Sequence, residues 1–193
     1  MRLAYKAFSP GFVCRGVAFK QNGAVNVTEA ANCRRNGWHC AENPADCLSY
    51  YPDIKRSWYC LVGIGGDTHE DGADSKIAAT ELTILKHLTL PEYFLHILVY
   101  IAKHPEEECC VARKGRGEAH GGYVVVRGKQ PFAKGKDGDI LAMAREGSDG
   151  RIEQIAVFVV GTDGVPADVY VDIDGKCEEV KPNGKSKSRR KRV

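Results

Sequence analysis

Eight cysteines and six histidines are the side chains of this sequence best suited to metal binding or nucleophilic chemistry. Structural zinc sites use pairs of Cys or His at short, regular spacings. The nearest approach is Cys33, His39, Cys40 and Cys47, whose gaps match no standard zinc motif. Cys40 with His39 or His69 could form a nucleophile and its base, but no known cysteine motif surrounds Cys40. We therefore favour free thiols and expect no bound metal.

A polar segment, residues 65–75, is the second candidate for chemistry, because it carries acidic residues or histidine at positions 67, 69, 70, 71 and 74. Hard oxygen ligands of this kind could hold a divalent ion. Their spacing lacks the pattern of a calcium-binding loop, so the sequence favours a solvated acidic loop. The adjacent thiols of Cys109 and Cys110 could be redox-active, but the sequence favours two buried thiols.

Residues 37–51 have the most informative local pattern. A short strand-like run leads into a polar turn, where Asn43, Pro44 and Asp46 have the preferences of an N-cap, a first helical position and a first helical turn. An apolar run from Trp58 follows and predicts a buried strand. Strand, helix and strand around a polar turn often form the wall of a ligand cleft. We therefore expect a cleft at this segment.

The net charge of +3 conceals two parts of opposite sign. Residues 181–193 hold seven of the 28 Lys and Arg and no acid, so the remaining 21 basic residues face 25 acidic ones and the body has a formal charge of −4. A groove that binds nucleic acid needs clustered positive charge on the folded part. Direct contact with nucleic acid is therefore expected only through the basic tail.

The elements that must position these residues fall into two groups. Residues 3–8, 58–64 and 77–88 are predicted strands, and Thr89 with Glu92 forms the capping box of a helix over 91–103. Residues 105–122 are polar and glycine-rich and predict a linker. Five strand-like segments follow, with an Asp-Gly pair in each gap, which predicts a hairpin meander. Irregular glycine spacing from 117 to 138 suggests a repeat-like β structure, without the regular period of a solenoid.

The fold class expected is therefore α+β, with a first domain over 1–104, a linker over 105–122, a small β-meander domain over 123–183 and a disordered basic tail over 184–193. The N-terminus lacks the apolar region of a signal peptide, and the longest apolar run, of ten residues, is too short to cross a bilayer. A cytoplasmic protein with reduced thiols is expected.

Four segments give the chain a resemblance to a known group of proteins. They are AYKAF at 4–8, CRG at 14–16, GWHCAENP at 37–44 and DSKIAATE at 74–81. On these segments the chain resembles an uncharacterised domain family of phage and prophage proteins, whose members often carry glycine- and alanine-rich repeats. The resemblance implies a phage or prophage origin and no particular chemistry.

The run GWHCA at 37–41, the helix that follows and the strand from Tyr59 are also similar to the central element of ADP-ribosyltransferases. This resemblance implies an ADP-ribosyltransferase-like mixed α/β domain over 1–104. His39 would take the place of the nicotinamide-stacking tyrosine, and Glu81 that of the catalytic glutamate. The family's first strand has a His-Gly pair where this chain has Lys6 and Ala7.

The chemistry that the second resemblance implies is transfer from NAD. The carboxylate of Glu81 would stabilise an oxocarbenium-like state, and His39 would stack on nicotinamide. Arg15 or Lys6 would contact a phosphate, and Tyr51 would belong to the same cofactor site. Taken alone, Glu81 also fits the exposed face of an alternating strand, and His39 fits the edge of a core.

Two functions follow from these patterns. The first is a phage- or prophage-encoded accessory protein that binds a host protein or protein–nucleic-acid complex, for instance an inhibitor of host defence of the anti-CRISPR type. The alternative is a diverged NAD-dependent ADP-ribosyltransferase that modifies a host protein. The Lys6-Ala7 pair favours the binding module, whereas Glu81 favours the enzyme. The sequence leaves the oligomeric state open.

Overall fold

The computed structural model describes residues 1–33, 35–72 and 74–178. The N-terminal half holds β1 (Arg2–Phe8), β2 (Val13–Cys14), β3 (Val17–Ala18), β4 (Val25–Val27), β5 (Trp38–Ala41), α1 (Asp46–Tyr50), β6 (Trp58–Glu70), β7 (Lys76–Leu88) and α2 (Leu90–Lys103). The C-terminal half holds β8 (Ala112–Glu118), β9 (Tyr123–Lys134), β10 (Ile140–Glu146), β11 (Ile152–Val159) and β12 (Val171–Asp172). The predicted tail over 184–193 lies outside the described residues.

The N-terminal strands pair in a closed circuit. β1 pairs with β5 and β6, and β7 pairs with both β5 and β6, while β4 pairs with residues 81–83 in the middle of β7. β6 and β7 form an antiparallel hairpin of two 13-residue strands, with register shifts that bend it. These bends let one hairpin reach strands on both of its sides, since bulges increase local twist and curvature.

Alternate residues of β1 face two different cores. Ala4 and Phe8 lie in a cluster inside the strand circuit, together with Val62 and Leu82. Ala7 lies on the opposite face of β1, in the cluster that packs against α2. Because successive side chains of a strand point to opposite faces, a strand with apolar residues on both faces must be covered on both. Helix α2 provides the second cover.

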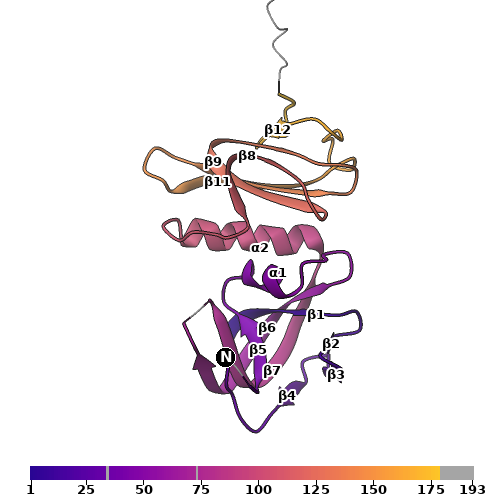
Figure 1. The fold of residues 1–193 in the computed structure, drawn as a ribbon, viewed down its shortest axis with the longest axis vertical. Coiled ribbons are helices and arrows are strands. Elements are labelled where there is room, and N and C mark those ends of the chain that lie inside the picture. Colours follow the sequence, from indigo (N-terminus) through magenta and orange to yellow (C-terminus); the bar gives the residue numbers. More distant parts are fainter. Residues whose placement is uncertain (34, 73, 179–193) are drawn as a thin grey trace, which may run out of the picture.

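Helix α2 lies between the N-terminal strands and the C-terminal sheet, as Figure 1 shows. Its buried residues Tyr93, Phe94, Ile97, Leu98 and Ile101 belong to one continuous cluster. That cluster also contains residues of both halves of the chain, among them Ala7, Tyr59 and Leu88 from the N-terminal half and Val125, Ile140 and Ala142 from the C-terminal half. The two halves therefore share one hydrophobic core.

The C-terminal sheet contains parallel neighbours instead of the predicted meander. Ala112, Val125 and Ala142 lie in register on β8, β9 and β10, which run parallel, and only β10 and β11 form an antiparallel hairpin around the Asp149-Gly150 turn. The parallel strands β8, β9 and β10 therefore lie side by side like successive turns of a solenoid, although the turns differ in length. β8 bends at Gly115, where the backbone of β9 approaches so closely that a Cβ on Gly128 would lie 3.2 Å from the Gly115 Cα.

The predicted α+β fold class is therefore wrong. The chain is mostly β, with two helices among its described residues and β-sandwich-like sheets, and its N-terminal part is not an ADP-ribosyltransferase-like mixed α/β domain. The segment expected to be a linker contains strand β8. The acidic segment expected to be a loop is largely the end of β6, so its residues continue a strand. No helix of the described chain is long and apolar enough to cross a membrane.

Candidate functional site

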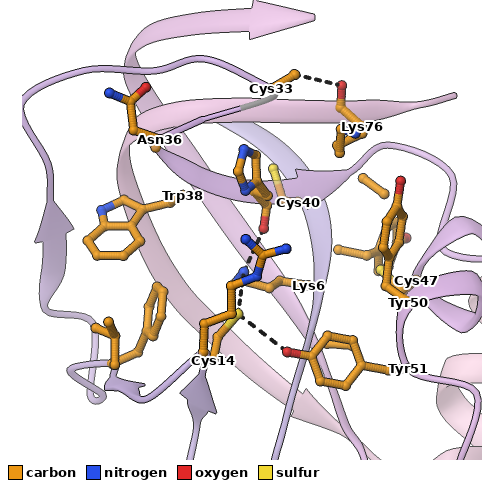
Figure 2. Close-up of a pocket in the computed structure, with 18 of the residues that line it drawn as sticks. Lys6, Cys14, Cys33, Asn36, Trp38, Cys40, Cys47, Tyr50, Tyr51 and Lys76 are labelled. Atoms are coloured by element: carbon orange, nitrogen blue, oxygen red, sulfur yellow. Dashed lines mark hydrogen bonds between the residues drawn. The ribbon is translucent and has the colours of Figure 1, made fainter. Parts of the chain in front are cut away.

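A cavity of about 410 Å³ opens in the N-terminal domain where β1 and β5 separate. Within these two described strands the pairing is limited to Tyr5 and Ala41. If the ladder continued, Ala7 would lie opposite His39, but the strands diverge before that point. The space between them is lined by β1, β5, the β2–β3 hairpin and the end of α1 (Figure 2).

The lining of this cavity is positively charged. Lys6, Arg15, Arg35 and Lys76 contribute to it, and none of the described lining residues is Asp or Glu. The rest is largely aromatic or sulfur-containing, and includes Phe19, Trp38, Tyr50, Tyr51, Cys14, Cys33, Cys40 and Cys47. A body whose overall charge is negative thus places four cations around one cavity, and of these Lys76 is paired with Asp71 at 4.0 Å. Such a lining attracts anions, because low-dielectric walls strengthen the field of the charges inside them.

Lys6 is the charged residue set deepest in this cavity, with a side chain only 6% exposed. Its Nζ donates a hydrogen bond of 2.7 Å to the carbonyl oxygen of His39, and so satisfies a backbone group that the separated strands leave without a ladder partner. The rings of Phe8 and Phe19 lie 5.3 Å from the ammonium. Among the described residues, no carboxylate forms an ion pair with Lys6. A buried cation without a counterion is costly, so an anion brought to this position is favoured.

Arg15 reaches the cavity from a strained turn. Cys14 pairs with Val17 in the β2–β3 hairpin, which leaves Arg15 and Gly16 as the two turn residues, with φ of +49° and +80°. Positive φ at both positions is typical of a tight type I′ turn, where Asn, Asp or Gly is normally preferred. A side chain in the left-handed region costs about 1–2 kcal/mol. The fold tolerates that cost at a position that places a guanidinium at the cavity.

Gly37 lets β5 begin close to its neighbours. Its φ is +99°, and a Cβ there would lie 3.0 Å from the Cα of Ala31 and 3.2 Å from the Cβ of Ala78. Only glycine combines this backbone conformation with so little space. The close approach sets the start of the strand that carries Trp38 and His39 to the cavity.

His39 is a neutral ring in this site. Burial lowers its pKa, hydrogen bonding to the carbonyl of Asn32 acts in the opposite direction, and the nearby cations Lys6, Lys76 and Arg15 lower it further. Its Nε2 lies 3.1 Å from the Asn32 carbonyl oxygen and therefore carries the proton. Nδ1 is then the unprotonated nitrogen, and it can accept a hydrogen bond from a ligand.

Three of the four thiols at the cavity are protonated at neutral pH. Burial raises the pKa of Cys40 and of Cys47 to about 12 and also raises that of Cys33. The fourth sulfur, that of Cys14, is half-buried and has two hydrogen-bond donors around it. The Tyr51 hydroxyl lies 3.3 Å from the Cys14 Sγ and the Lys6 ammonium lies 3.7 Å from it, as the dashed lines of Figure 2 show.

Helix α1 forms the other wall of the cavity, although it does not begin as predicted. Its N-cap is Ala45, and the Asn43 side chain instead accepts a hydrogen bond of 2.9 Å from the Ala45 N–H. Asp46 lies in the first turn, where it accepts from the backbone and hydroxyl of Ser75. The helix ends at Tyr50, and the Tyr59 hydroxyl donates to the Tyr51 carbonyl at 2.6 Å, which fixes the position of Tyr51.

The fold brings four of the five sequence-predicted site residues together. Lys6, Arg15, His39 and Tyr51 all line the cavity. Glu81 does not line it: it lies on β7 opposite Val27 and Gly65, with an exposed side chain. The carboxylate that the transferase resemblance assigns to catalysis is therefore outside the site that holds the other four.

Sequence reasoning missed Cys14, Arg35, Trp38 and Lys76 as members of the same site. One signal was available for Cys14, since it adjoins the predicted Arg15 in the CRG segment. No local pattern identifies Lys76, which lies 70 residues from Lys6 and reaches the cavity through the pairing of β7 with β5. The described residues contain no group of three or more His, Cys, Asp or Glu arranged to hold a metal ion.

A family model described as "Domain of unknown function (DUF7666)" matches residues 2–96. Over these residues, slightly less than half of the chain, the sequence is similar to an uncharacterised domain family. Every described residue that lines the cavity falls within the matched range, so the cavity lies in the part of the chain that is similar to DUF7666. The match also includes the first half of α2, the helix that packs against the C-terminal sheet.

Comparison with curated proteins and with solved structures gave no match to either. The DUF7666 family has no assigned function, so the phage origin, the host-protein partner and NAD-dependent transfer stay predictions.

Proposed function

We propose that this protein is a binding module whose DUF7666-like domain holds a small anionic ligand, a phosphate-bearing molecule of nucleotide size, in the cavity around Lys6. The observation that carries the proposal is the buried Lys6 ammonium, which faces a cavity of about 410 Å³ with four basic residues and no acidic residue in its described lining. Cavities of a few hundred Å³ with few polar groups are typical ligand sites.

Phosphate suits this set of donors. Arginine binds phosphate oxygens in a two-pronged geometry, and lysine supplies a compact positive charge. The neutral His39 ring adds an acceptor at Nδ1, which suits a ligand hydroxyl or amide group next to the anion. The aromatic residues Trp38 and Tyr51 provide surface for the part of the ligand that is not charged. NAD, the cofactor expected from the sequence, contains this phosphate chemistry.

The proposal describes binding and assigns no reaction. Glu81 lies outside the cavity, and the three most buried thiols are protonated. Apart from the Cys14 thiol, the polar groups that remain are hydrogen-bond donors and one acceptor, and together with the aromatic rings they suit a binding site.

The test is isothermal titration calorimetry with ADP, NAD, inorganic phosphate and adenosine. We expect ADP or NAD to bind at least about tenfold more tightly than adenosine, a difference of about 1.4 kcal/mol, and the affinity to fall with rising salt because the attraction is electrostatic. Lys6→Met should weaken binding by about tenfold or more.

Two further variants make the result interpretable. Arg15→Gly removes a cation at a position whose positive φ suits glycine, so it should weaken binding without loss of fold. Lys129→Met removes an exposed lysine of β9, outside the cavity, and should leave the affinity unchanged. Equal binding of ADP and adenosine, or no heat of binding for any of the three anions at millimolar concentration, would overturn the proposal.

A further inference from the structure

Cys14 combines features that the other cysteines of the cavity lack. It lies on a short edge hairpin at the cavity wall and is half-buried, whereas Cys33, Cys40 and Cys47 are buried. Cys33 and Cys40 also donate to backbone carbonyls, at 2.8 Å from Cys33 to His69 and at 3.5 Å from Cys40 to Ile77. The Cys14 sulfur has the opposite role, since it accepts from two donors.

The donors around the Cys14 sulfur are an ammonium and a phenol. A thiolate formed at this position would find the Lys6 Nζ at 3.7 Å and the Tyr51 Oη at 3.3 Å, both already pointed at the sulfur (Figure 2). The thiolate is the reactive form of cysteine in exchange reactions, and reactive cysteines lie in positively charged, partly exposed surroundings. Lys6 is buried and has no carboxylate partner among the described residues, so its charge is available to the sulfur.

The charge of the cavity decides which reagent reaches this thiol. A molecule that approaches Cys14 passes Arg15, the adjacent turn residue, and enters a lining that also contains Arg35 and Lys76. Anions are concentrated there and cations are repelled.

We propose that Cys14 is a modification site that exchanges selectively with disulfides carrying negative charge, of which glutathione disulfide is the type. The proposal rests on the proposed function, because it uses the same anion-attracting cavity. In the step, the Cys14 sulfur attacks one sulfur of the disulfide, a new S–S bond forms and the old one breaks. The second sulfur leaves with the bonding electron pair and takes up the proton that Cys14 lost. Cys14 is oxidised and the disulfide is the oxidant.

Disulfide exchange at Cys14 would switch ligand binding in the cavity off, and reduction would restore it. The attached anionic thiol would occupy the space around Lys6 and Arg15, so a modified protein cannot hold its anionic ligand there. Reduction by a free thiol reverses the exchange and empties the site.

The experiment treats the reduced full-length protein with three disulfides: glutathione disulfide, which is anionic, bis(2-hydroxyethyl) disulfide, which is neutral, and cystamine, which is cationic. Peptide mass spectrometry then measures the rate at each cysteine. Cys110 and Cys177 are exposed and lie outside the cavity, so they serve as internal references. Relative to Cys110, we expect Cys14 to favour glutathione disulfide over cystamine by about tenfold or more.

Variants separate the reactivity of the thiol from the charge of the cavity. Arg15→Gly should lower the selectivity of Cys14 toward that of Cys110, and Lys129→Met should leave it unchanged. Cys14→Ser should abolish the adduct on the peptide that contains residue 14, while Cys110 and Cys177 react as in the wild type.

The outcomes distinguish this inference from the proposed function. If Cys14 fails to react with any of the three disulfides while ADP binds as expected, this inference is wrong and the binding function stands. If Cys14 reacts equally with all three, the cavity does not select anions, and both are contradicted. A preference for cystamine would overturn both as well.

Discussion

Two partly buried histidines, His39 and His96, show how single residues couple this fold to pH. His39 lies at the cavity, and the Nδ1 of His96 on α2 shares a hydrogen bond of 2.8 Å with the Tyr5 hydroxyl of β1. Burial is the main cause that lowers the pKa of each ring in the folded protein. In the unfolded chain a histidine titrates near a pKa of about 6.5.

We predict that acid destabilises the protein first through these histidines. Below a pH of about 6.5 the unfolded chain binds protons that the folded protein does not, so the free energy of unfolding rises with pH across this window. The stability is fully present above the unfolded pKa and is lost as pH falls toward the lowered folded values. Urea titrations at a series of pH values measure the slope. The ordinary histidine pKa places this window at about pH 5–7. If the free energy of unfolding does not change with pH in that window, the prediction is wrong.

Replacing one ring identifies the source of this slope. His96→Asn should remove roughly half of it, because two histidines contribute in the same direction. His120→Asn, at an exposed position after β8, is the matched control and should leave the slope as it is.

At the scale of elements, helix α2 depends on the capping box that the sequence predicted. The Thr89 side chain accepts from the Glu92 N–H, and the Glu92 carboxylate accepts from the Thr89 N–H at 2.9 Å. Lys86 and the Thr89 donors hold the pKa of Glu92 down, at about 2. The capping box fixes the start of a helix whose apolar face packs against both sheets. A local sequence pattern therefore stabilises the contact between the two halves of the chain.

We predict that Thr89→Ala lowers the free energy of unfolding by about 1 kcal/mol, because a helical N–H loses its acceptor. Urea denaturation followed by circular dichroism measures the change. Thr89→Ser keeps the hydroxyl and should behave like the wild type. If the alanine and serine variants lose stability equally, the side-chain oxygen is not what stabilises the helix start.

The whole molecule is expected to unfold as one unit, because both halves of the chain contribute to the cluster around α2. Ile140 of β10 is 2% exposed within that cluster, whereas both tryptophans, Trp38 and Trp58, lie in the N-terminal half. Tryptophan fluorescence therefore reports on the N-terminal half, while Ile140 can be substituted in the C-terminal half.

We predict that Ile140→Ala costs about 2–5 kcal/mol, as for other large-to-small core changes, and shifts tryptophan fluorescence and circular dichroism transitions together. The control is Leu95→Ala, because Leu95 of α2 is 42% exposed, and it should change the free energy of unfolding by no more than about 0.5 kcal/mol. A fluorescence transition that stays in place while the circular dichroism transition moves would show that the halves unfold separately.

The sequence by itself determined the elements that depend on local patterns. The strands β1, β6 and β7 follow from their apolar residues, and α2 follows from Thr89, Glu92 and its apolar face. Four of the predicted site residues, Lys6, Arg15, His39 and Tyr51, do meet at one cavity.

Only the tertiary structure decided how these elements pair and what lies between them. The separation of β1 from β5, the parallel stacking of β8, β9 and β10, and the arrival of Lys76 beside Lys6 all depend on residues far apart in the chain. The same limit applies to Glu81, which a local match assigned to the site and which strand pairing places elsewhere. Strand register follows from which faces can be buried against each other, and a local pattern does not contain that information.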